Sequence, residues 1–449
     1  MDALATGRPG QRAVFLSYAL PALAGTLVSS VSVLADGLFV GRILGAGALA
    51  AVNLTLPIFY VFLAAGVMIA VGGGTLANHR LGAKDGPGAS RLASGTMLLL
   101  AAAGLGLTLL LGAFLGPAIG LLGARGEVAG QVREYLAPLL LYYAPVMLNV
   151  GVGAFLRAGG RPGLSLAAGA AGAACDIALD WLLIARLGLG LRGAALSSAA
   201  GAALQLLLGL AALARACPSI KPARPALSRG ELGSILANGS SELVGQLSVT
   251  IVAYAYNRIL LARMGVAGVA AYTISGYLCF LSSMLVLGFG QGLWPLAGRA
   301  WGGGEAGEAR SWLSLAMRWA LGAAAAAAAP ALLFPGPLAA LFARAGEEAS
   351  SGLAARALFF TALSLLPAAY SSIASAYLTA IGDAAGSAAV ASLRGLVLIC
   401  LFVFLFPLLF GDLGVWLALP ASEACTLAVS IALLARPARP ARAGERPPR

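Results

Sequence analysis

Long apolar stretches, broken at short intervals by Gly, Pro and charged residues, dominate the chain. An apolar stretch of about 20 residues is enough to cross the hydrocarbon core of a bilayer as a helix. Taking the breaks as loops predicts twelve membrane-spanning helices. They lie near residues 13–40, 47–76, 89–117, 130–156, 163–186, 192–214, 230–262, 267–298, 309–335, 351–380, 385–409 and 413–435. We therefore expect an all-α polytopic membrane protein.

A polar, proline-containing stretch interrupts the pattern halfway along the chain and predicts two lobes of six helices each. Ser228 followed by Glu231 fits a capping box, which would begin the seventh helix. The predicted division is a cytoplasmic N-terminus at 1–12, an N-terminal lobe at 13–214, a cytoplasmic linker at 215–229, a C-terminal lobe at 230–435 and a tail at 436–449. The tail is rich in Pro and Arg, so we expect it to be disordered.

An internal repeat supports this division. Four short matches keep one order and nearly one offset of 220 to 222 residues. They are Gly45–Ala51 with Gly265–Ala271, Leu76–Gly82 with Leu296–Gly302, Leu156 and Gly160 with Leu378 and Gly382, and Gly193 and Leu196 with Gly414 and Leu417. An offset of six helices gives both lobes the same orientation, related by an axis along the membrane normal.

The net charge of +12 changes this picture little, because the Lys and Arg residues are dispersed among apolar stretches. No basic domain with exposed aromatic residues is present, which argues against a nucleic-acid partner. Most of the 29 Lys and Arg residues lie in or near loops on the side of the two termini. By the positive-inside rule we expect both termini in the cytoplasm and a multi-pass protein of the cell (inner) membrane. No cleavable signal peptide is expected before the first span.

Acidic residues inside the apolar spans are the main candidates for chemistry. Asp36, Asp176, Asp180, Glu242 and Glu423 all lie where a charge is costly unless it is protonated, paired or bound to a cation. Asp176 and Asp180 are four residues apart, so they share a helix face. Two adjacent carboxylates resist double ionisation and tend to hold a proton or a cation. The alternative is that they form salt bridges with neighbours such as Arg157 or Arg186.

The second half carries a polar stripe of Asn238, Glu242 and Gln246 on one helix face. It is a candidate for substrate binding, and hydrogen bonding between helices is the alternative. Tyr254 and Tyr272 are candidates to offer π faces to a cationic substrate, with packing as the alternative.

Pro21, within the first span, frees a backbone carbonyl and permits a kink. It is a candidate hinge, with inert bending of the helix as the alternative. The Gly72–Gly74 run lacks the strand, Lys and Ser or Thr of a phosphate loop, so no nucleotide is expected. Without a constellation of His, Cys or metal ligands the chain is not expected to be an enzyme. No cofactor is expected beyond a coupling ion, H⁺ or Na⁺.

At several of these residues the sequence resembles the multidrug and toxic compound extrusion (MATE) family. The matching segments are Asp36–Gly41 running into Gly45–Ala51, Leu179 and Asp180, Gly193–Leu196, and Gln291–Pro295. The resemblance implies two six-helix lobes around a central cleft and an ion site built on Asp36 and Asp180, with Asp176 and Ser198 beside them. Asp36 and Asp180 would be metal ligands only if Na⁺ is the coupling ion.

The sequence departs from the family at Asp176, where relatives more often carry Asn, and this adds a negative charge. The resemblance also implies a functional residue in the seventh span, and either Glu242 or Gln246 fits its position. Glu423 is a further candidate in that lobe.

We therefore expect a monomeric antiporter in the lipid bilayer that exports organic cations in exchange for H⁺ or Na⁺ by rocking of its lobes. A flippase for lipid-linked saccharides, with the same two-lobe architecture, is the alternative. It predicts a groove lined with Arg to hold pyrophosphate, whereas the charges within the predicted spans are mainly acidic.

Overall fold

The computed structural model describes residues 10–341 and 348–436, and every regular element in these ranges is helical. The first lobe contains α1 (Gln11–Phe39), α2 (Ala46–Gly82), α3 (Gly86–Ala113), α4 (Leu115–Leu121), α5 (Gly126–Ala158), α6 (Pro162–Asp180) and α7 (Gly190–Ala216). The second contains α8 (Arg229–Gly302), α9 (Ala306–Leu333), α10 (Pro335–Ala340), α11 (Glu348–Ala380), α12 (Ala384–Ser392), α13 (Leu398–Phe410) and α14 (Asp412–Ala435). Apart from Arg436, the predicted tail lies outside the described residues.

Eleven helical segments in the described ranges are long and apolar enough to cross a membrane. One of them, α8, joins two helices across a sharp turn at Gly265, whose φ of 64° and ψ of −154° are readily adopted only by glycine. The two halves of α8 therefore correspond to the predicted spans 230–262 and 267–298, which gives the expected total of twelve. The chain is a multi-pass helical membrane protein.

The seventh span begins where the sequence predicts. No helix forms over residues 217–228, and the Ser228 side chain then accepts a hydrogen bond from the Glu231 backbone N–H at 3.2 Å. In return, Oε2 of Glu231 accepts from the Ser228 backbone N–H at 2.9 Å. The reciprocal pair completes the capping box and satisfies two backbone donors that the first turn leaves unpaired.

The internal repeat appears as repeated turn geometry. Three pairs of glycines with positive φ occupy matching turns in the two halves of the chain, each pair 220 to 222 residues apart. They are Gly45 and Gly265 (φ 90° and 64°), Gly160 and Gly382 (80° and 81°), and Gly190 and Gly411 (61° and 60°). The lobes are therefore pseudo-symmetric, as predicted.

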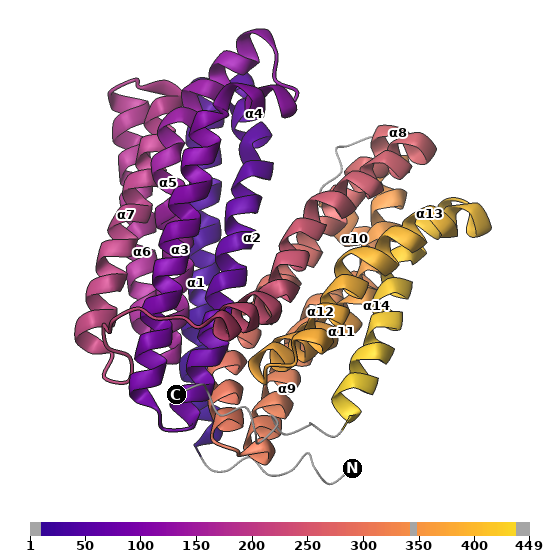
Figure 1. Cartoon of the computed structure of the whole chain (residues 1–449). Coiled ribbons are helices and arrows are strands. Elements are labelled where there is room, and N and C mark those ends of the chain that lie inside the picture. Colours follow the sequence, from indigo (N-terminus) through magenta and orange to yellow (C-terminus); the bar gives the residue numbers. More distant parts are fainter. Residues whose placement is uncertain (1–9, 342–347, 437–449) are drawn as a thin grey trace.

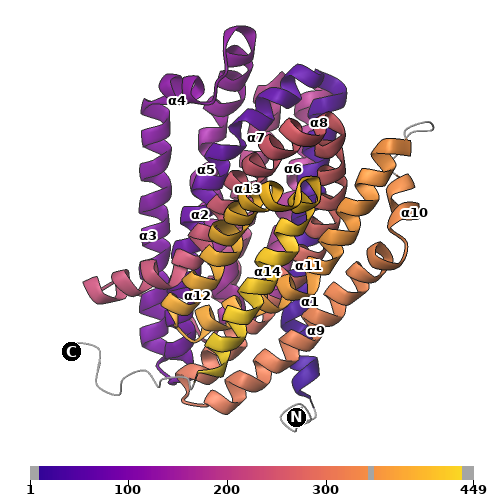
Figure 2. The same ribbon diagram turned by 90° about the vertical axis from the view of Figure 1, so that its right-hand side faces the viewer.

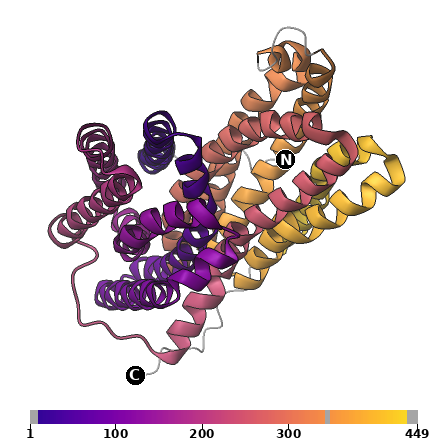
Figure 3. The same ribbon diagram turned by 90° about the horizontal axis from the view of Figure 1, so that it is seen from above.

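The lobes diverge from one end of the molecule (Figure 1), and seen from above they lie side by side (Figure 3). They meet near the end at which α1 begins and α14 finishes, which we call the terminal end (Figure 2). There α2 packs against both halves of α8, and α1 packs against the second half. From the terminal end the ribbons of the two lobes spread apart toward the opposite end of the molecule (Figure 1).

Glycines allow the two lobes to approach at backbone distance. A Cβ atom added at Gly72 of α2 would lie 2.0 Å from the carbonyl oxygen of Ile235, and one at Gly239 of α8 would lie 1.9 Å from that of Met68. Only a residue without a side chain fits at such a crossing.

The repeat-related glycines Gly82 and Gly302 make a reciprocal contact nearer the terminal end. Gly82 lies against the carbonyl oxygen of Arg299, and Gly302 lies against that of His79. These contacts are consistent with the pseudo-symmetry of the two lobes.

Polar contacts add to this interface between the lobes. The Trp294 indole donates to the Thr75 hydroxyl at 2.8 Å, and Nε2 of His79 lies 2.7 Å from the carbonyl oxygen of Ala380. Glu231 accepts from Arg91 at 2.8 Å and lies 3.7 Å from Arg80. Ion pairs as well as packing therefore hold the start of α8 against α2 and α3.

Candidate functional site

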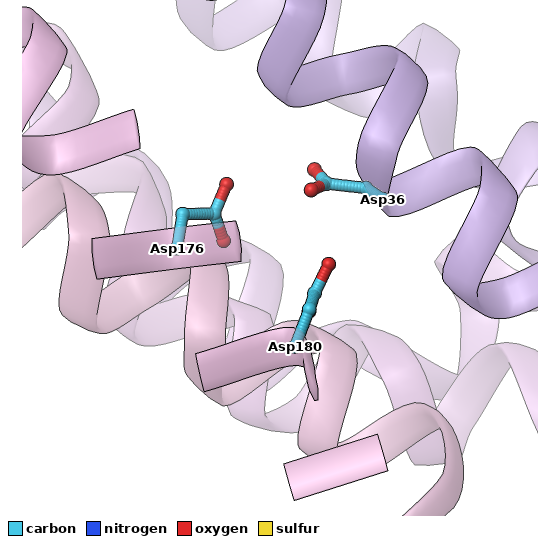
Figure 4. A group of neighbouring side chains, drawn as sticks. All are labelled: Asp36, Asp176 and Asp180. Carbon is cyan, nitrogen blue, oxygen red and sulfur yellow. The ribbon is translucent and has the colours of Figure 1, made fainter. Parts of the chain in front are cut away.

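Three aspartates converge between α1 and α6. Asp36 comes from α1, and Asp176 and Asp180 come from successive turns at the end of α6 (Figure 4). Each offers a carboxylate oxygen, and these three oxygens all lie within 4.8 Å of one another. The structure therefore brings together the three acids that the sequence singles out in the first lobe.

Hydroxyl groups line the same site. Ser32, one turn before Asp36, donates to Oδ2 of Asp176 at 2.8 Å. Ser197 of α7 donates to Oδ1 of Asp180. The hydroxyl of Ser198, the residue expected from the sequence, lies beside Asp176. Ser197 and Ser32 are thus additional contacts that sequence reasoning missed.

The site holds more acceptors than donors. Asp180 is fully buried and Asp176 nearly so, while Asp36 is half-buried. One oxygen of each aspartate is buried without a hydrogen bond among the described residues: Oδ1 of Asp36, Oδ1 of Asp176 and Oδ2 of Asp180. Unpaired acceptors of this kind are costly to bury, and a proton or an oxygen-seeking cation would satisfy them.

No basic side chain neutralises these acids within the described ranges. The ion pairs there all involve other carboxylates. Arg186 lies over the ring of Trp181 at 5.0 Å, and Nε of Arg157 is buried without a hydrogen bond. The salt bridges considered from the sequence are therefore not formed in this structure.

Each helix that supplies an acid changes to a π-helical segment within about one turn after it. The π-helical segment η2 (Val40–Leu44) begins four residues after Asp36, and η3 (Trp181–Arg186) begins at the residue after Asp180. Wider π turns are rare and occur frequently at functional sites. The third such segment, η4 (Leu393–Val397), lies in the second lobe between α12 and α13.

Tyrosines of α5 complete the surroundings of the aspartates. Tyr135 and Tyr142 lie close enough to Asp36 and Asp176 to experience their charge. They are seven residues apart, so they share one face of α5. That spacing is visible in the sequence, but nothing in the sequence indicates which lobe helix faces the acids.

The residues of the polar stripe in the second lobe differ in whether they have a hydrogen-bond partner. The Asn238 side-chain amide donates to the carbonyl oxygen of Thr379 at 3.2 Å, which is the helix-to-helix contact considered as the alternative. Glu242 and Gln246 follow on the same face and are half-buried. The Glu242 carboxyl has no hydrogen bond or ion pair with another side chain among the described residues.

Glu423 has a different environment from Glu242. Its two carboxylate oxygens lie 2.9 and 3.2 Å from Nε of Arg394 in η4, and Arg394 also donates to the Ser372 hydroxyl. The structure therefore places this acid in a partly buried ion pair within the lobe rather than as a free carboxylate.

The two candidate tyrosines also differ. Tyr272 stacks on Tyr256 with ring centroids 4.8 Å apart and an interplanar angle of 12°. Tyr254 is 66% exposed, and its position two residues from Tyr256 turns it to another face of α8.

Comparison with known proteins agrees with this architecture. The profile described as MatE matches residues 21–182 and 244–412, most of both lobes. The chain belongs to the MatE family. The first segment of the match contains Asp36, Asp176 and Asp180, and membership places the chain among transporters rather than enzymes.

Curated MatE relatives include the multidrug export protein MepA of Staphylococcus aureus, which is 28% identical over 285 residues. That alignment covers 63% of this chain and 62% of the relative's length.

Solved transporter structures match over nearly the whole chain. One is a multidrug resistance MATE family transporter in an outward-facing conformation, at 25% identity and a TM-score of 0.85, covering 95% of both chains. Another is a MOP superfamily transporter from Pyrococcus furiosus, with the same identity, TM-score and coverage. The binding pocket of that transporter has reverse polarity, which suggests a different function for it.

Proposed function

We propose that this chain is a secondary antiporter that exports organic cations in exchange for H⁺ or Na⁺ bound at Asp36, Asp176 and Asp180. The observation that carries the proposal is the meeting of three buried carboxylates without a basic partner among the described residues. Such a site is stable when a cation occupies it and costly when it is empty. Its energy therefore depends on ion occupancy, which is the property that coupling requires.

The arrangement of the lobes suggests which state of the transport cycle the structure represents. Contact at the terminal end, and similarity to an outward-facing relative, support an outward-facing state if the termini are cytoplasmic. In this state the ion would load from outside and promote release of the substrate. Rocking would then expose the site to the cytoplasm, where the ion leaves and a new substrate binds. Pro21 in α1 remains the proposed hinge.

The second lobe would contribute to substrate recognition. Glu242 has no partner among the described residues, so it is our first candidate to meet a cationic group, with Gln246 and Asn238 on the same face. The Tyr272 and Tyr256 stack would offer an aromatic surface. We assign Glu423 a supporting role because Arg394 already neutralises it.

Transport in proteoliposomes with separately imposed pH and Na⁺ gradients tests the proposal. We expect one of the two gradients to drive movement of a fluorescent organic cation, and Asp36→Asn to abolish that movement. Glu127→Gln is the matched control, since Glu127 is an exposed acid in the first turn of α5. Gradient-driven transport that survives in Asp36→Asn at the level of Glu127→Gln would refute the assigned role.

A further inference from the structure

A cavity lies within the C-terminal lobe, near the terminal end. Its volume is about 990 Å³, and its walls come from α9, α11, the α11–α12 turn and the ends of α8 and α14. Figure 2 shows the beginning of α9 and the end of α14 at the same end of this lobe. Every lining residue belongs to one lobe, so this cavity is neither the three-aspartate site nor a groove between the lobes.

Arginines give this cavity a positive rim. Arg310 and Arg318 of α9 and Arg436 after α14 all line it and are exposed. The acid that lines it, Asp383, uses its carboxylate to cap α12 by accepting from the Gly386 backbone N–H at 3.0 Å. Among the described ion pairs, none involves Arg310 or Arg436. The rim therefore carries excess positive charge.

The walls of the cavity are apolar. Met317 and Leu321 continue the face of α9 that carries Arg310, at intervals of seven and four residues, and Leu433 faces them from α14. A buried hydroxyl adds a polar group, because Tyr377 of α11 is only 3% exposed and its oxygen has no hydrogen bond of normal geometry. Arg310 lies beside that hydroxyl.

This combination fits an amphipathic anion. A guanidinium binds phosphate through paired N–H donors, and the Tyr377 hydroxyl can donate to a further phosphate oxygen. Leu and Met side chains solvate a hydrocarbon chain, and the volume is at the upper end of that of small-molecule sites. Basic pockets between membrane helices near the interface bind acidic lipid headgroups for these reasons.

We propose that the cavity binds an anionic phospholipid, with the phosphate held by Arg310, Arg436 and Tyr377 and an acyl chain lying along Met317, Leu321 and Leu433. The bound lipid would bridge α9, α11 and α14 at the terminal end of the lobe. The proposal does not depend on the transport function, because it concerns binding alone.

Native mass spectrometry of the purified full chain tests this site. We expect phosphatidylglycerol to be retained at least about tenfold more tightly than phosphatidylcholine, which has the same acyl chains and no net charge. Arg310→Ala with Arg436→Ala should remove most of that preference. The matched control is Arg224→Ala with Arg229→Ala, which removes two exposed arginines, one in the non-helical stretch before α8 and one at its first residue. Equal lipid retention by both double variants would overturn the proposal.

Two further arms distinguish a bound lipid from a soluble anion and from a folding defect. Inorganic phosphate at millimolar concentration should fail to displace phosphatidylglycerol, and displacement would reassign the cavity to a soluble anion and contradict the lipid proposal. If the double arginine variant does not fold, Tyr377→Phe removes a single hydroxyl. This variant should lower the affinity for phosphatidylglycerol by about threefold and leave the affinity for phosphatidylcholine unchanged. Unchanged affinity for both lipids in Tyr377→Phe would exclude the hydroxyl from the site.

Discussion

Asp36, Asp176 and Asp180 lie together without a basic partner among the described residues, whereas Glu423 binds Arg394 directly. Both arrangements bury carboxylates, but they respond differently to ions. The Glu423 pair is neutral as it stands and needs no further ligand. The three aspartates reach neutrality only by taking up protons or a cation. Their occupancy by these ions therefore depends on the ion concentration on the side to which the site is open.

Asp176 is the residue where this chain departs from its expected family pattern, and its replacement tests what the third charge contributes. Asp176→Asn keeps the size of the side chain and leaves Asp36 and Asp180 in place. We expect transport to continue but to require about tenfold more coupling ion for half-maximal rate, because one attractive charge is lost from the site. The rate measured against coupling-ion concentration in proteoliposomes checks this. An unchanged concentration dependence would mean that Asp176 does not contact the ion.

The sequence predicted the relative position of side chains correctly where helix periodicity alone determines it. The spacing of Asp176 and Asp180 placed both on one face, and the structure has them there. The hydroxyl contacts could not be assigned in the same way. Ser197 and Ser198 are adjacent, and the packing of α7 against α6 decides that Ser197 bonds Asp180 while Ser198 lies beside Asp176.

At the scale of elements, the crossing of α2 and α8 depends on small residues. Gly72 lies against the Ile235 backbone and Gly239 against the Met68 backbone, so the two helices touch without intervening side chains. In a bilayer such close packing is a main source of helix association, because lipid competes equally well for apolar side chains.

Gly72→Ala tests the role of this crossing. The added methyl would lie 2.0 Å from a carbonyl oxygen, so α2 and α8 must move apart. We expect a loss of about 1–3 kcal/mol in stability, seen as a lower unfolding temperature in detergent. Gly106→Ala in α3 is the control, since a Cβ there meets nothing within 4 Å. It should be neutral or stabilising by up to about 1 kcal/mol. Equal behaviour of the two variants would contradict the close crossing.

Elements were predictable from the sequence because loops and apolar spans differ so strongly in composition. The break between the seventh and eighth spans was expected near Gly265, and that glycine carries the turn. The π-helical segments η2, η3 and η4 were not predicted, since no residue pattern distinguishes them from ordinary helix. Their placement depends on packing between helices.

At the scale of the whole molecule, the relative position of the lobes rests on a limited set of contacts at the terminal end. Glu231 is central to them, because it pairs with Arg91 and Arg80 across the interface while also capping α8. The sequence predicted the cap, which is local. It gave no indication of the ion pairs, because they depend on which lobe surfaces meet.

Glu231→Gln separates these two roles. Glutamine still completes a capping box, so α8 should begin as before, while the ion pairs are lost. Partly exposed pairs contribute about 0.2–1 kcal/mol each, so we expect loss of both to lower the ratio of contacting to separated lobes by about two- to thirtyfold. Distances between spin labels on α3 and α9 would measure this population. Asp412→Asn, which removes the Arg263 pair within one lobe, is the control and should leave the distances unchanged.

The central claim is that ion occupancy at the three aspartates drives substrate movement. The most direct test compares Asp180→Asn with wild type in proteoliposomes, measuring both accumulation of a fluorescent organic cation against its gradient and exchange of that cation at equilibrium. We predict that Asp180→Asn retains exchange, which requires a folded carrier, and loses accumulation, which requires coupling. Accumulation by Asp180→Asn equal to that of wild type would contradict the account.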